Sequence, residues 1–435
     1  EMENQKNRSR SAATIDTEDW VEILKDDVEE FVGYDYLETE VKITKYRKVK
    51  QKKKEYYQLI FNISPFYAES GGQVGDKGYI EANGERIRIL DTKKENNLNI
   101  HITEKLPIDP KATFKAVVDS GKRASTANNH TATHLLHNAL REVLGEHIEQ
   151  KGSLVHPDYL RFDFSHFQKL SDDEIQRIER IVNEKIRQNI PVDEHRNIPM
   201  KAASDMGAIA LFGEKYGDTV RVIQFDNSVE LCGGTHVKHT GQIGFFKIMS
   251  ESSIAAGIRR IEAITGEKVA EFVFEQIQQL NEVKSLFKNP KNIVESVKSL
   301  FDEVSTLNKH MDEMTKEQAK AIKKLLKEQV QNVNGVNFIG YKIGLNSANA
   351  IKDLAFQLKN EMDNLVLVVG AEIKGKANLS IMISESLVES KGWNASQIIR
   401  EAAKEIQGGG GGQAFYATAG GKKPEGLHAA IEKVK

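Results

Sequence analysis

Two short segments of the chain combine residue types that bind transition metals. His130 and His134 stand at i and i+4, and the only cysteine stands in Cys232-Gly-Gly-Thr-His236. On a helix the first pair would point in the same direction, and the glycine-bearing segment could wrap a thiolate and a third imidazole around the same ion. Three imidazoles and a thiolate favour tetrahedral Zn²⁺ over Mg²⁺ or Ca²⁺, although ligand type alone does not exclude copper. The sequence therefore predicts a zinc site formed by His130, His134, Cys232 and His236.

Other interpretations of these residues stay open at this point. A single histidine is more often a satisfied polar residue than a ligand, and His137, further along the same helix face, is expected to have a supporting role. Thr131 follows His130, so the HExxH pattern of common metalloproteases is absent, which disfavours a protease. A structural zinc has four protein ligands, whereas a catalytic zinc keeps a position for water or substrate, and spacing does not decide between them.

The helix that must carry the first pair is predicted over residues 128–144. Its apolar residues recur at i, i+3 and i+4, and Gly145 stands where a glycine would end it. The apolar positions are Ala132, Leu135, Leu136, Ala139, Leu140, Val143 and Leu144. Helical and strand-like stretches mix throughout residues 121–266, which predicts an α+β domain around the metal site.

The preceding residues are expected to be mostly β structure. Residues 1–32 are polar and predict a helical connector, and residues 33–120 predict a small β-barrel, with a sandwich as the alternative. The strand candidates of this region are 40–46, 56–63, 85–90 and 113–118.

Two further domains are expected after residue 266. Residues 267–335 contain two helix-period stretches, the second with apolar residues at coiled-coil spacing, and predict an antiparallel helical hairpin. Residues 336–435 predict a C-terminal glycine-rich α/β domain. Its five consecutive glycines, Gly408 to Gly412, could be a flexible turn or could bring main-chain N–H groups close to a phosphate. The predicted fold class is multidomain α+β.

Composition excludes several classes of protein. A length of 435 residues implies two to four domains, and 61 basic against 63 acidic residues give a net charge of −2, so any RNA binding must come from local patches. One such patch is the run from Lys42 to Lys54, in which eight of thirteen residues are Lys or Arg, although such runs are usually solvated loops. No apolar stretch is long enough for a membrane span or fits a signal peptide. A single cysteine suits a reducing compartment, and we predict a cytoplasmic protein.

The metal-ligand segments, together with residues 66–78 before them and 257–266 after them, resemble the editing half of alanyl-tRNA synthetase. The resemblance also covers the family's small barrel, helical hairpin and glycine-rich C-terminal domain, and so spans essentially the whole chain. No segment resembles the class II ATP-binding motifs, so the aminoacylation half, with its ATP, is expected to be absent from this chain. The free-standing editing relatives are similar only through the barrel and editing domains, which favours a piece of the synthetase itself.

The resemblance implies a deacylase that hydrolyses Ser-tRNA(Ala) and Gly-tRNA(Ala), in a parent protein that would attach alanine to tRNA(Ala) with ATP. A pocket for alanine cannot strongly reject serine or glycine, whereas a second site with polar groups shaped for the serine hydroxyl can reject alanine. Zinc would either activate water or hold the substrate. The alternative is a non-catalytic tRNA-binding module with a structural zinc.

The resemblance also implies roles for individual residues. Thr133 would sense the serine hydroxyl, although a helical threonine that bonds back to its own backbone is equally compatible. Gln150 would orient substrate or water, with Asp163 beside it as a carboxylate partner for a metal-bound histidine or for substrate. Arg259 and Arg260 match positions near the tRNA end, where guanidinium groups suit phosphate.

Partners of the remaining domains are likewise implied by the resemblance. Gly408 to Gly412, Lys422 and Lys423 are the candidates for contact with the outer corner of tRNA(Ala). A homodimer through the hairpin or the C-terminal domain is implied, and the heptad pattern only permits it.

Overall fold

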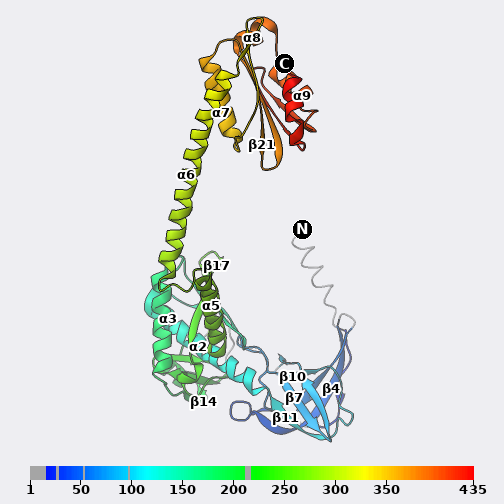
Figure 1. Cartoon of the computed structure of the whole chain (residues 1–435). Coiled ribbons are helices and arrows are strands. Elements are labelled where there is room, and N and C mark those ends of the chain that lie inside the picture. The colour runs from blue at the N-terminus through cyan, green and yellow to red at the C-terminus, as the bar shows by residue number, and fades with distance from the viewer. Residues whose placement is uncertain (1–15, 26–28, 52–53, 97, 211–216) are drawn as a thin grey trace. The chain divides into compact units, whose positions relative to one another are not determined.

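The computed structural model describes residues 16–25, 29–51, 54–96, 98–210 and 217–435 (Figure 1). The chain separates into two compact units, residues 1–280 and 281–435. Both units combine helices with mainly antiparallel sheets, which confirms the predicted multidomain α+β class. In the described part of the chain, no helix has the length and apolar character required to cross a membrane.

The first unit begins with an antiparallel sheet in the strand order β8-β7-β11-β4-β5-β10-β9. Inward and outward side chains alternate along its strands, as in β11, where Phe114, Ala116 and Val118 are buried. The strands are β4 (Glu38–Gln51), β5 (Lys54–Phe61), β7 (Gly78–Ala82), β8 (Glu85–Ile89), β9 (Asp91–Glu95), β10 (Leu98–Thr103) and β11 (Thr113–Val118). All four predicted strands are confirmed, as β4, β5, β8 and β11.

Two predictions for this region are not met. The strand order ends on β8 and β9, and no pairing between described residues joins these two strands, so the predicted barrel closure is not observed. The helical connector is wrong for the described part of residues 1–32, which contains the two-residue strands β1 (Asp16–Thr17), β2 (Val21–Glu22) and β3 (Glu30–Phe31). β1 and β2 pair with β4, and β3 pairs with β6 (Ile63–Ser64). A strand of two residues is too short to show the alternation of apolar and polar residues from which a strand can be predicted. Residues 1–15 of the predicted connector lie outside the described residues.

The predicted metal-bearing helix is α2 (Ser120–Leu144). It begins where the Asp119 side chain accepts a hydrogen bond from the Lys122 N–H, and it ends at Gly145, whose φ of 112° suits glycine, as predicted. It packs on a four-stranded antiparallel sheet in the order β12-β13-β18-β17 and on helix α3 (Asp172–Arg187). The strands are β12 (Gln150–Val155), β13 (Leu160–Ser165), β17 (Phe246–Ala255) and β18 (Ile258–Thr265).

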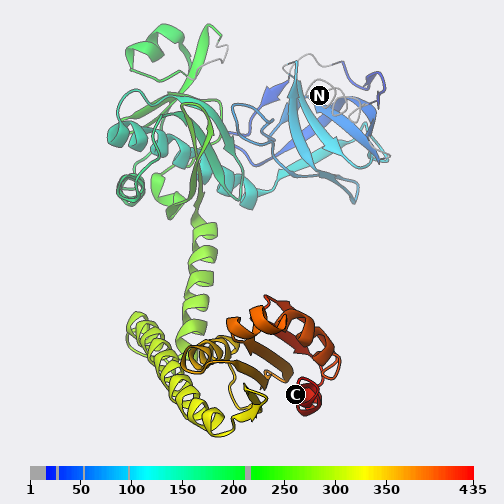
Figure 2. The same ribbon diagram turned by 90° about the horizontal axis from the view of Figure 1, so that it is seen from above.

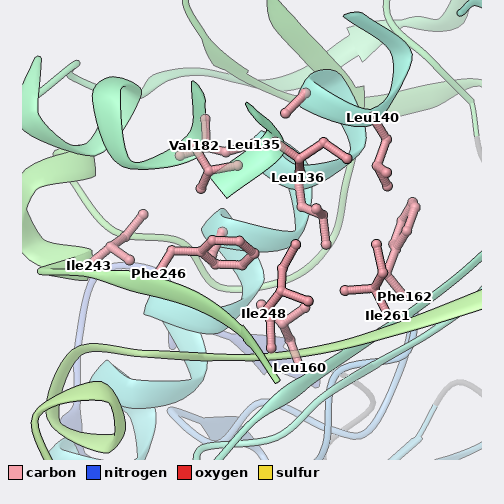
Figure 3. Close-up of a cluster of buried hydrophobic side chains, with 14 of the residues drawn as sticks. Leu135, Leu136, Leu140, Leu160, Phe162, Val182, Ile243, Phe246, Ile248 and Ile261 are labelled. Atoms are coloured by element: carbon pink, nitrogen blue, oxygen red, sulfur yellow. The ribbon is translucent and has the colours of Figure 1, made fainter. Parts of the chain in front are cut away.

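The core beneath α2 fixes the rotation of this helix. Leu135, Leu136 and Leu140 belong to the same buried cluster as Phe162 and Ile261 of the sheet (Figure 3). Because this apolar face is buried against the sheet, the rotation of α2 about its own axis is fixed. The directions of its other side chains, including His130 and His134, are fixed with it. A separate three-stranded antiparallel sheet completes the region, with the strands β14 (Asp193–Pro199), β15 (Thr219–Phe225) and β16 (Ser228–Leu231). Helix α4 (Met200–Asp205) packs on β14 and β15. The 3₁₀ turn η1 (Thr240–Ile243) follows β16 along the chain.

Two helices follow, α5 (Gly266–Leu286) and α6 (Ile293–Glu328), in place of the two predicted helical stretches. Lys288 and Asn289 between them have positive φ angles, which ends the helical run. From Leu300 to Met314 the apolar side chains at coiled-coil spacing on α6, which we call the seam, are exposed, for example Leu307 at 55% and Met311 at 65%. No packing of this part of the seam is therefore seen in the described chain, and the hairpin stays a prediction.

The C-terminal unit is a six-stranded sheet in the order β19-β20-β21-β22-β24-β23, with helices on both faces (Figure 2). Only β20 and β21 are parallel, and α7 (Ala348–Glu361) is the crossover between them. The strands are β19 (Gln331–Val333), β20 (Val336–Ile343), β21 (Leu365–Ile373), β22 (Lys376–Ile383), β23 (Gly408–Gly412) and β24 (Tyr416–Gly421). The other helices are α8 (Glu385–Lys391), α9 (Ala395–Ala402), the 3₁₀ turn η2 (Pro424–Gly426) and α10 (Leu427–Glu432).

The five consecutive glycines form an edge strand, so the interpretation as a flexible turn is wrong. β23 pairs antiparallel with β24, from Gly408 opposite Gly421 to Gly412 opposite Ala417. A Cβ atom at Gly408, Gly410 or Gly412 would come within 2.0, 2.4 and 2.3 Å of a backbone oxygen of β24. Alternate glycines are thus required by close backbone approach.

Candidate metal centre

The four predicted ligands converge in the structure. His130 and His134 come from α2, and Cys232 and His236 come from the segment after β16, yet one ligand atom of each lies within 4.8 Å of the others. Cys232 Sγ is 3.3 Å from His130 Nε2 and 3.2 Å from His236 Nε2. A Cβ atom on Gly234 would stand 2.0 Å from the His130 ring, so this loop needs glycine to pass the imidazole.

The environment keeps the three imidazoles neutral. Burial lowers the pKa of His130 and of His236 well below the ordinary value, and repulsion from the neighbouring imidazoles adds to this. Burial also lowers the pKa of His134. Neutral imidazole is the form that binds metals.

The residues fit a zinc ion. His134 Nδ1 is buried and has no hydrogen-bond partner among the described residues, an arrangement that costs free energy unless another group binds this nitrogen. Three imidazoles and a thiolate are a donor set typical of zinc.

Glu230 is a residue of the candidate site that sequence reasoning missed. It is buried in β16 two residues before Cys232, with Oε2 3.5 Å from His134 Nε2 and Oε1 3.0 Å from His137 Nδ1. Burial raises the pKa of Glu230, but the two histidines outweigh this and the pKa is lowered overall. An ionised carboxylate beside a metal-binding histidine fixes the orientation of the ring. His137, for which a supporting role was expected, contacts Glu230 and is not among the four residues of the metal cluster. The only signal in the sequence was an acidic residue between two apolar residues, Val229 and Leu231.

Gln73 is a second missed residue, contributed by the loop at residues 66–78. Its side chain is fully buried, and its Oε1 lies 2.9 Å from the Thr235 N–H and 2.7 Å from His130 Nδ1. Since a main-chain N–H only donates, this atom must be the amide oxygen, and His130 Nδ1 must carry the proton. Gln73 therefore leaves His130 Nε2 unprotonated, facing Cys232. Thr131 Oγ1 lies 3.1 Å from His236 Nδ1, and its hydroxyl can either donate to this nitrogen or accept from it.

The Gln73→Leu variant is expected to bind zinc about 10- to 100-fold more weakly than the parent chain, because it frees His130 to take the wrong tautomer. Gln73→Glu keeps an acceptor at the same place and is expected to bind zinc as tightly as the parent. Competition with a chromogenic chelator measures both affinities. Equal zinc affinity in the leucine and glutamate variants would contradict this role for Gln73.

Thr133 and Gln150 lie at the metal cluster. Both line a cavity of about 250 Å³ together with His130, His134 and Cys232, and the 66–78 loop closes it with Tyr67, Ser70 and Gly71. The Thr133 hydroxyl donates to the Asn129 carbonyl oxygen at 2.8 Å, and the Gln150 amide nitrogen donates to Ser153 Oγ at 3.3 Å.

Asp163, Arg259 and Arg260 are placed differently from what was expected. None of the three is among the described residues that line this cavity. Arg260 donates to both carboxylate oxygens of Asp163, at 2.7 and 2.8 Å, and Arg259 is paired with Glu251. The expected contact of Asp163 with a metal-binding histidine is not observed, because Glu230 holds that position. Both guanidinium groups are engaged within the chain, and their role toward tRNA stays a prediction.

The basic run at residues 42–54 is mostly strand β4 and not a loop. Lys48 pairs with Glu55, and Arg47 pairs with Glu95 and lies over the ring of Trp20. Lys52 and Lys53 lie outside the described residues. Contact between this surface and tRNA stays a prediction.

Three family models match the chain. The model described as "Threonyl and Alanyl tRNA synthetase second additional domain" matches residues 220–262, which include Cys232 and His236. The model "tRNA synthetases class II (A)" matches residues 1–121, and the "DHHA1 domain" model matches residues 335–435.

Curated relatives match over the whole chain. Proteins named "Alanine--tRNA ligase" are 54% identical over 437 residues in Cytophaga hutchinsonii, 54% over 435 residues in Bacteroides fragilis and 49% over 437 residues in Porphyromonas gingivalis. Each match covers 100% of this chain and 50% of the relative, so the chain spans about half the length of these relatives. The crystal structure of the C-Ala domain from Aquifex aeolicus alanyl-tRNA synthetase is 27% identical and covers 24% of this chain and 96% of that chain, with a TM-score of 0.22.

Proposed function

The chain belongs to the alanyl-tRNA synthetase family, and on that premise we propose that it is an editing deacylase, which hydrolyses the ester of Ser-tRNA(Ala) and Gly-tRNA(Ala). The reaction adds water to the ester carbonyl carbon and releases the amino acid and the ribose hydroxyl of the tRNA. The parent protein would attach alanine to tRNA(Ala) with ATP.

The observation that carries this proposal is the cavity at the metal cluster. Its volume of about 250 Å³ is below the range of about 300–1,000 Å³ found for sites of drug-sized ligands, and suits a small aminoacyl group. Three of the four metal-cluster residues line it, so an ester in the cavity would lie next to the metal. Zinc bound there would supply positive charge that polarises a carbonyl oxygen or lowers the pKa of a water molecule.

Thr133 supports selection of serine. Its hydroxyl proton is used in the hydrogen bond to the Asn129 carbonyl, so its oxygen can only accept a hydrogen bond from a substrate. The serine hydroxyl can donate that bond, whereas alanine has no donor. A polar group left unpaired in a buried site costs about 1–3 kcal/mol, which corresponds to a preference for serine of about 5- to 150-fold. Glycine has no hydroxyl, so its hydrolysis is proposed from the family alone.

Gln150 is proposed to orient the attacking water or the substrate ammonium group. Ser153 holds its amide nitrogen, which fixes the direction of the amide within the cavity. Asp163 and Arg260, as an ion pair on neighbouring strands, are proposed to support the wall that carries Gln150, because Gln150 pairs with the residue after Asp163.

The Gln150→Ala variant is expected to lower kcat for Ser-tRNA(Ala) about 10- to 100-fold, because water and substrate lose an orienting hydrogen bond. Zinc content and unfolding temperature should match those of the parent, since Gln150 touches no ligand. Gln188→Ala, at the end of α3, is the matched control. Unchanged kinetics in Gln150→Ala would remove this residue from the site.

One experiment tests the proposed function against a structural role for the metal. Four protein donors suffice to close a zinc site, which favours a non-catalytic tRNA-binding module as the second candidate. Purified chain loaded with zinc is incubated with Ser-tRNA(Ala), Gly-tRNA(Ala) and Ala-tRNA(Ala), and released amino acid is measured. Preferential release of serine supports the deacylase, whereas binding of all three without release supports the second candidate.

The other proposals concern partners. We propose tRNA(Ala) as the partner, with Arg259 and Arg260 near its aminoacylated end and Gly408 to Gly412, Lys422 and Lys423 near its outer corner. A homodimer through the predicted helical hairpin or the C-terminal unit, and a cytoplasmic location, are proposed on the same basis.

A further inference from the structure

The metal-ligand loop is held from outside by its main chain. Three consecutive carbonyl oxygens, those of Cys232, Gly233 and Gly234, each accept a hydrogen bond from a side chain elsewhere in the fold. Arg221 Nη1 donates to the Cys232 oxygen at 2.9 Å and to the Gly234 oxygen at 2.6 Å. The Tyr34 hydroxyl donates to the Gly233 oxygen at 2.6 Å.

The two donors also support each other. The Arg221 guanidinium lies over the Tyr34 ring, 4.0 Å from its centroid. Arg221 Nε donates to Glu194 at 2.6 Å, Arg196 donates to the same carboxylate, and Arg196 reaches Asp35 with two hydrogen bonds of 2.6 and 3.0 Å. Charges thus alternate from Asp35, through Arg196 and Glu194, to Arg221 of β15, which contacts the loop.

The charge of Arg221 is unfavourable for cation binding, so attraction of the metal does not explain its presence. Arg221 lines the metal cavity itself, and a positive group there opposes a second cation. Its geometry offers a different explanation. One planar guanidinium holds two carbonyls and a carboxylate at once, which a lysine ammonium on a flexible stem does not reproduce.

We propose that Arg221 and Tyr34 are positioning residues for the metal site: they hold the Cys232–Gly234 backbone so that Sγ and the His236 ring face α2 before a metal arrives. Glycine loses more conformational freedom on ordering than any other residue, so an untethered Gly233-Gly234 loop would lose that entropy when the metal binds. With the hydrogen bonds from Arg221 and Tyr34, the loop is already ordered when the protein folds, so metal binding does not have to order it. The site should therefore bind its ion with higher affinity and release it more slowly. The inference rests on the metal centre of the proposed function but not on deacylation.

The test uses the full chain loaded with one equivalent of zinc. Tyr34→Phe removes one hydrogen bond and keeps the ring under Arg221, and Arg221→Lys keeps the charge and removes the fork. Tyr36→Phe, at an exposed tyrosine two residues from Tyr34, is the matched control. Zinc affinity and the rate of zinc transfer to a chromogenic chelator are measured, with the absorption spectrum of the cobalt-substituted protein as a report on ligand geometry.

Tyr34→Phe is expected to bind zinc about 2- to 10-fold more weakly, and Arg221→Lys about 10- to 100-fold more weakly, each with faster transfer to the chelator and an altered cobalt spectrum. Unfolding of the metal-free protein should change little in Tyr34→Phe. Parent-like zinc affinity and cobalt spectrum in both variants would overturn the proposal, whatever happens to their unfolding temperatures. A parent chain that takes up no zinc would overturn it as well. A parent chain that binds zinc but hydrolyses no ester would reject the proposed function and leave this proposal to be decided by the metal measurements.

Discussion

Cys232→Ala is expected to lose bound zinc and, with it, release of serine from Ser-tRNA(Ala). The thiolate is the one charged donor of the set, and Sγ lies within 3.3 Å of two imidazoles. Structural zinc sites bind with about 10–16 kcal/mol, so the loss of one of four ligands removes about 3 kcal/mol or more, which is more than 100-fold in affinity. Dialysis against a chelator of matched strength should leave the parent with one zinc per chain and the variant with almost none.

The control for this experiment is His310→Ala, which replaces an exposed histidine on α6 and is expected to keep both zinc and activity. His236→Ala should behave like Cys232→Ala, since it removes another member of the cluster. Zinc retained at one equivalent by Cys232→Ala would contradict the assignment of this cysteine as a ligand. Loss of zinc with unchanged serine release would instead reject the metal-dependent mechanism.

Arg123→Met is expected to destabilise the first unit by about 3–5 kcal/mol, because it leaves a buried carboxylate without its partner. Arg123 and Asp76 are 7% and 6% exposed, and Arg123 Nε donates to both oxygens of Asp76. The same guanidinium donates to the carbonyl oxygens of Gly33 and Pro65, at 2.5 and 2.9 Å. Arg123 thus joins α2 to the N-terminal sheet region.

Denaturant unfolding followed by tryptophan fluorescence measures this effect. The two tryptophans lie in different units, so a Trp393→Phe background leaves Trp20 to report on the first unit. Arg86→Met is the control, because the Arg86–Glu81 pair is exposed to solvent and should contribute little to stability. The double variant Arg123→Met with Asp76→Leu should recover part of the lost stability. An Arg123→Met variant as stable as Arg86→Met would rule out this role of the buried pair.

The sequence allowed prediction of the features that depend on local pattern. Helix α2 follows from the spacing of its leucines and from Gly145, and the four ligands follow from two short motifs whose residue types have few other common uses together. The N-terminal strands follow from alternation, but closure of a barrel depends on which strands meet, and alternation within one strand carries no information about its neighbour.

The residues that support the ligands could not be found in this way. Gln73, Glu230 and Arg221 are single polar residues, and they act on the metal site only through side-chain geometry set by the tertiary fold. Strand β23 was missed for another reason. It consists of five glycines, which have no side chains, so no alternation of apolar and polar residues could indicate a strand. Asp163 was expected beside Gln150, as a carboxylate partner for a metal-binding histidine or for substrate, but it forms an ion pair with Arg260.

The wall that the 66–78 loop contributes to the cavity limits how this protein can be shortened. A segment comprising residues 121–266 would retain the four residues of the metal cluster. It would lack Gln73, whose amide oxygen determines which nitrogen of His130 carries the proton, and Tyr34, which donates a hydrogen bond to the Gly233 oxygen. Such a piece is expected to be a poor starting point for moving the metal site into another protein. The smallest portable unit of the site is the pair of regions folded together.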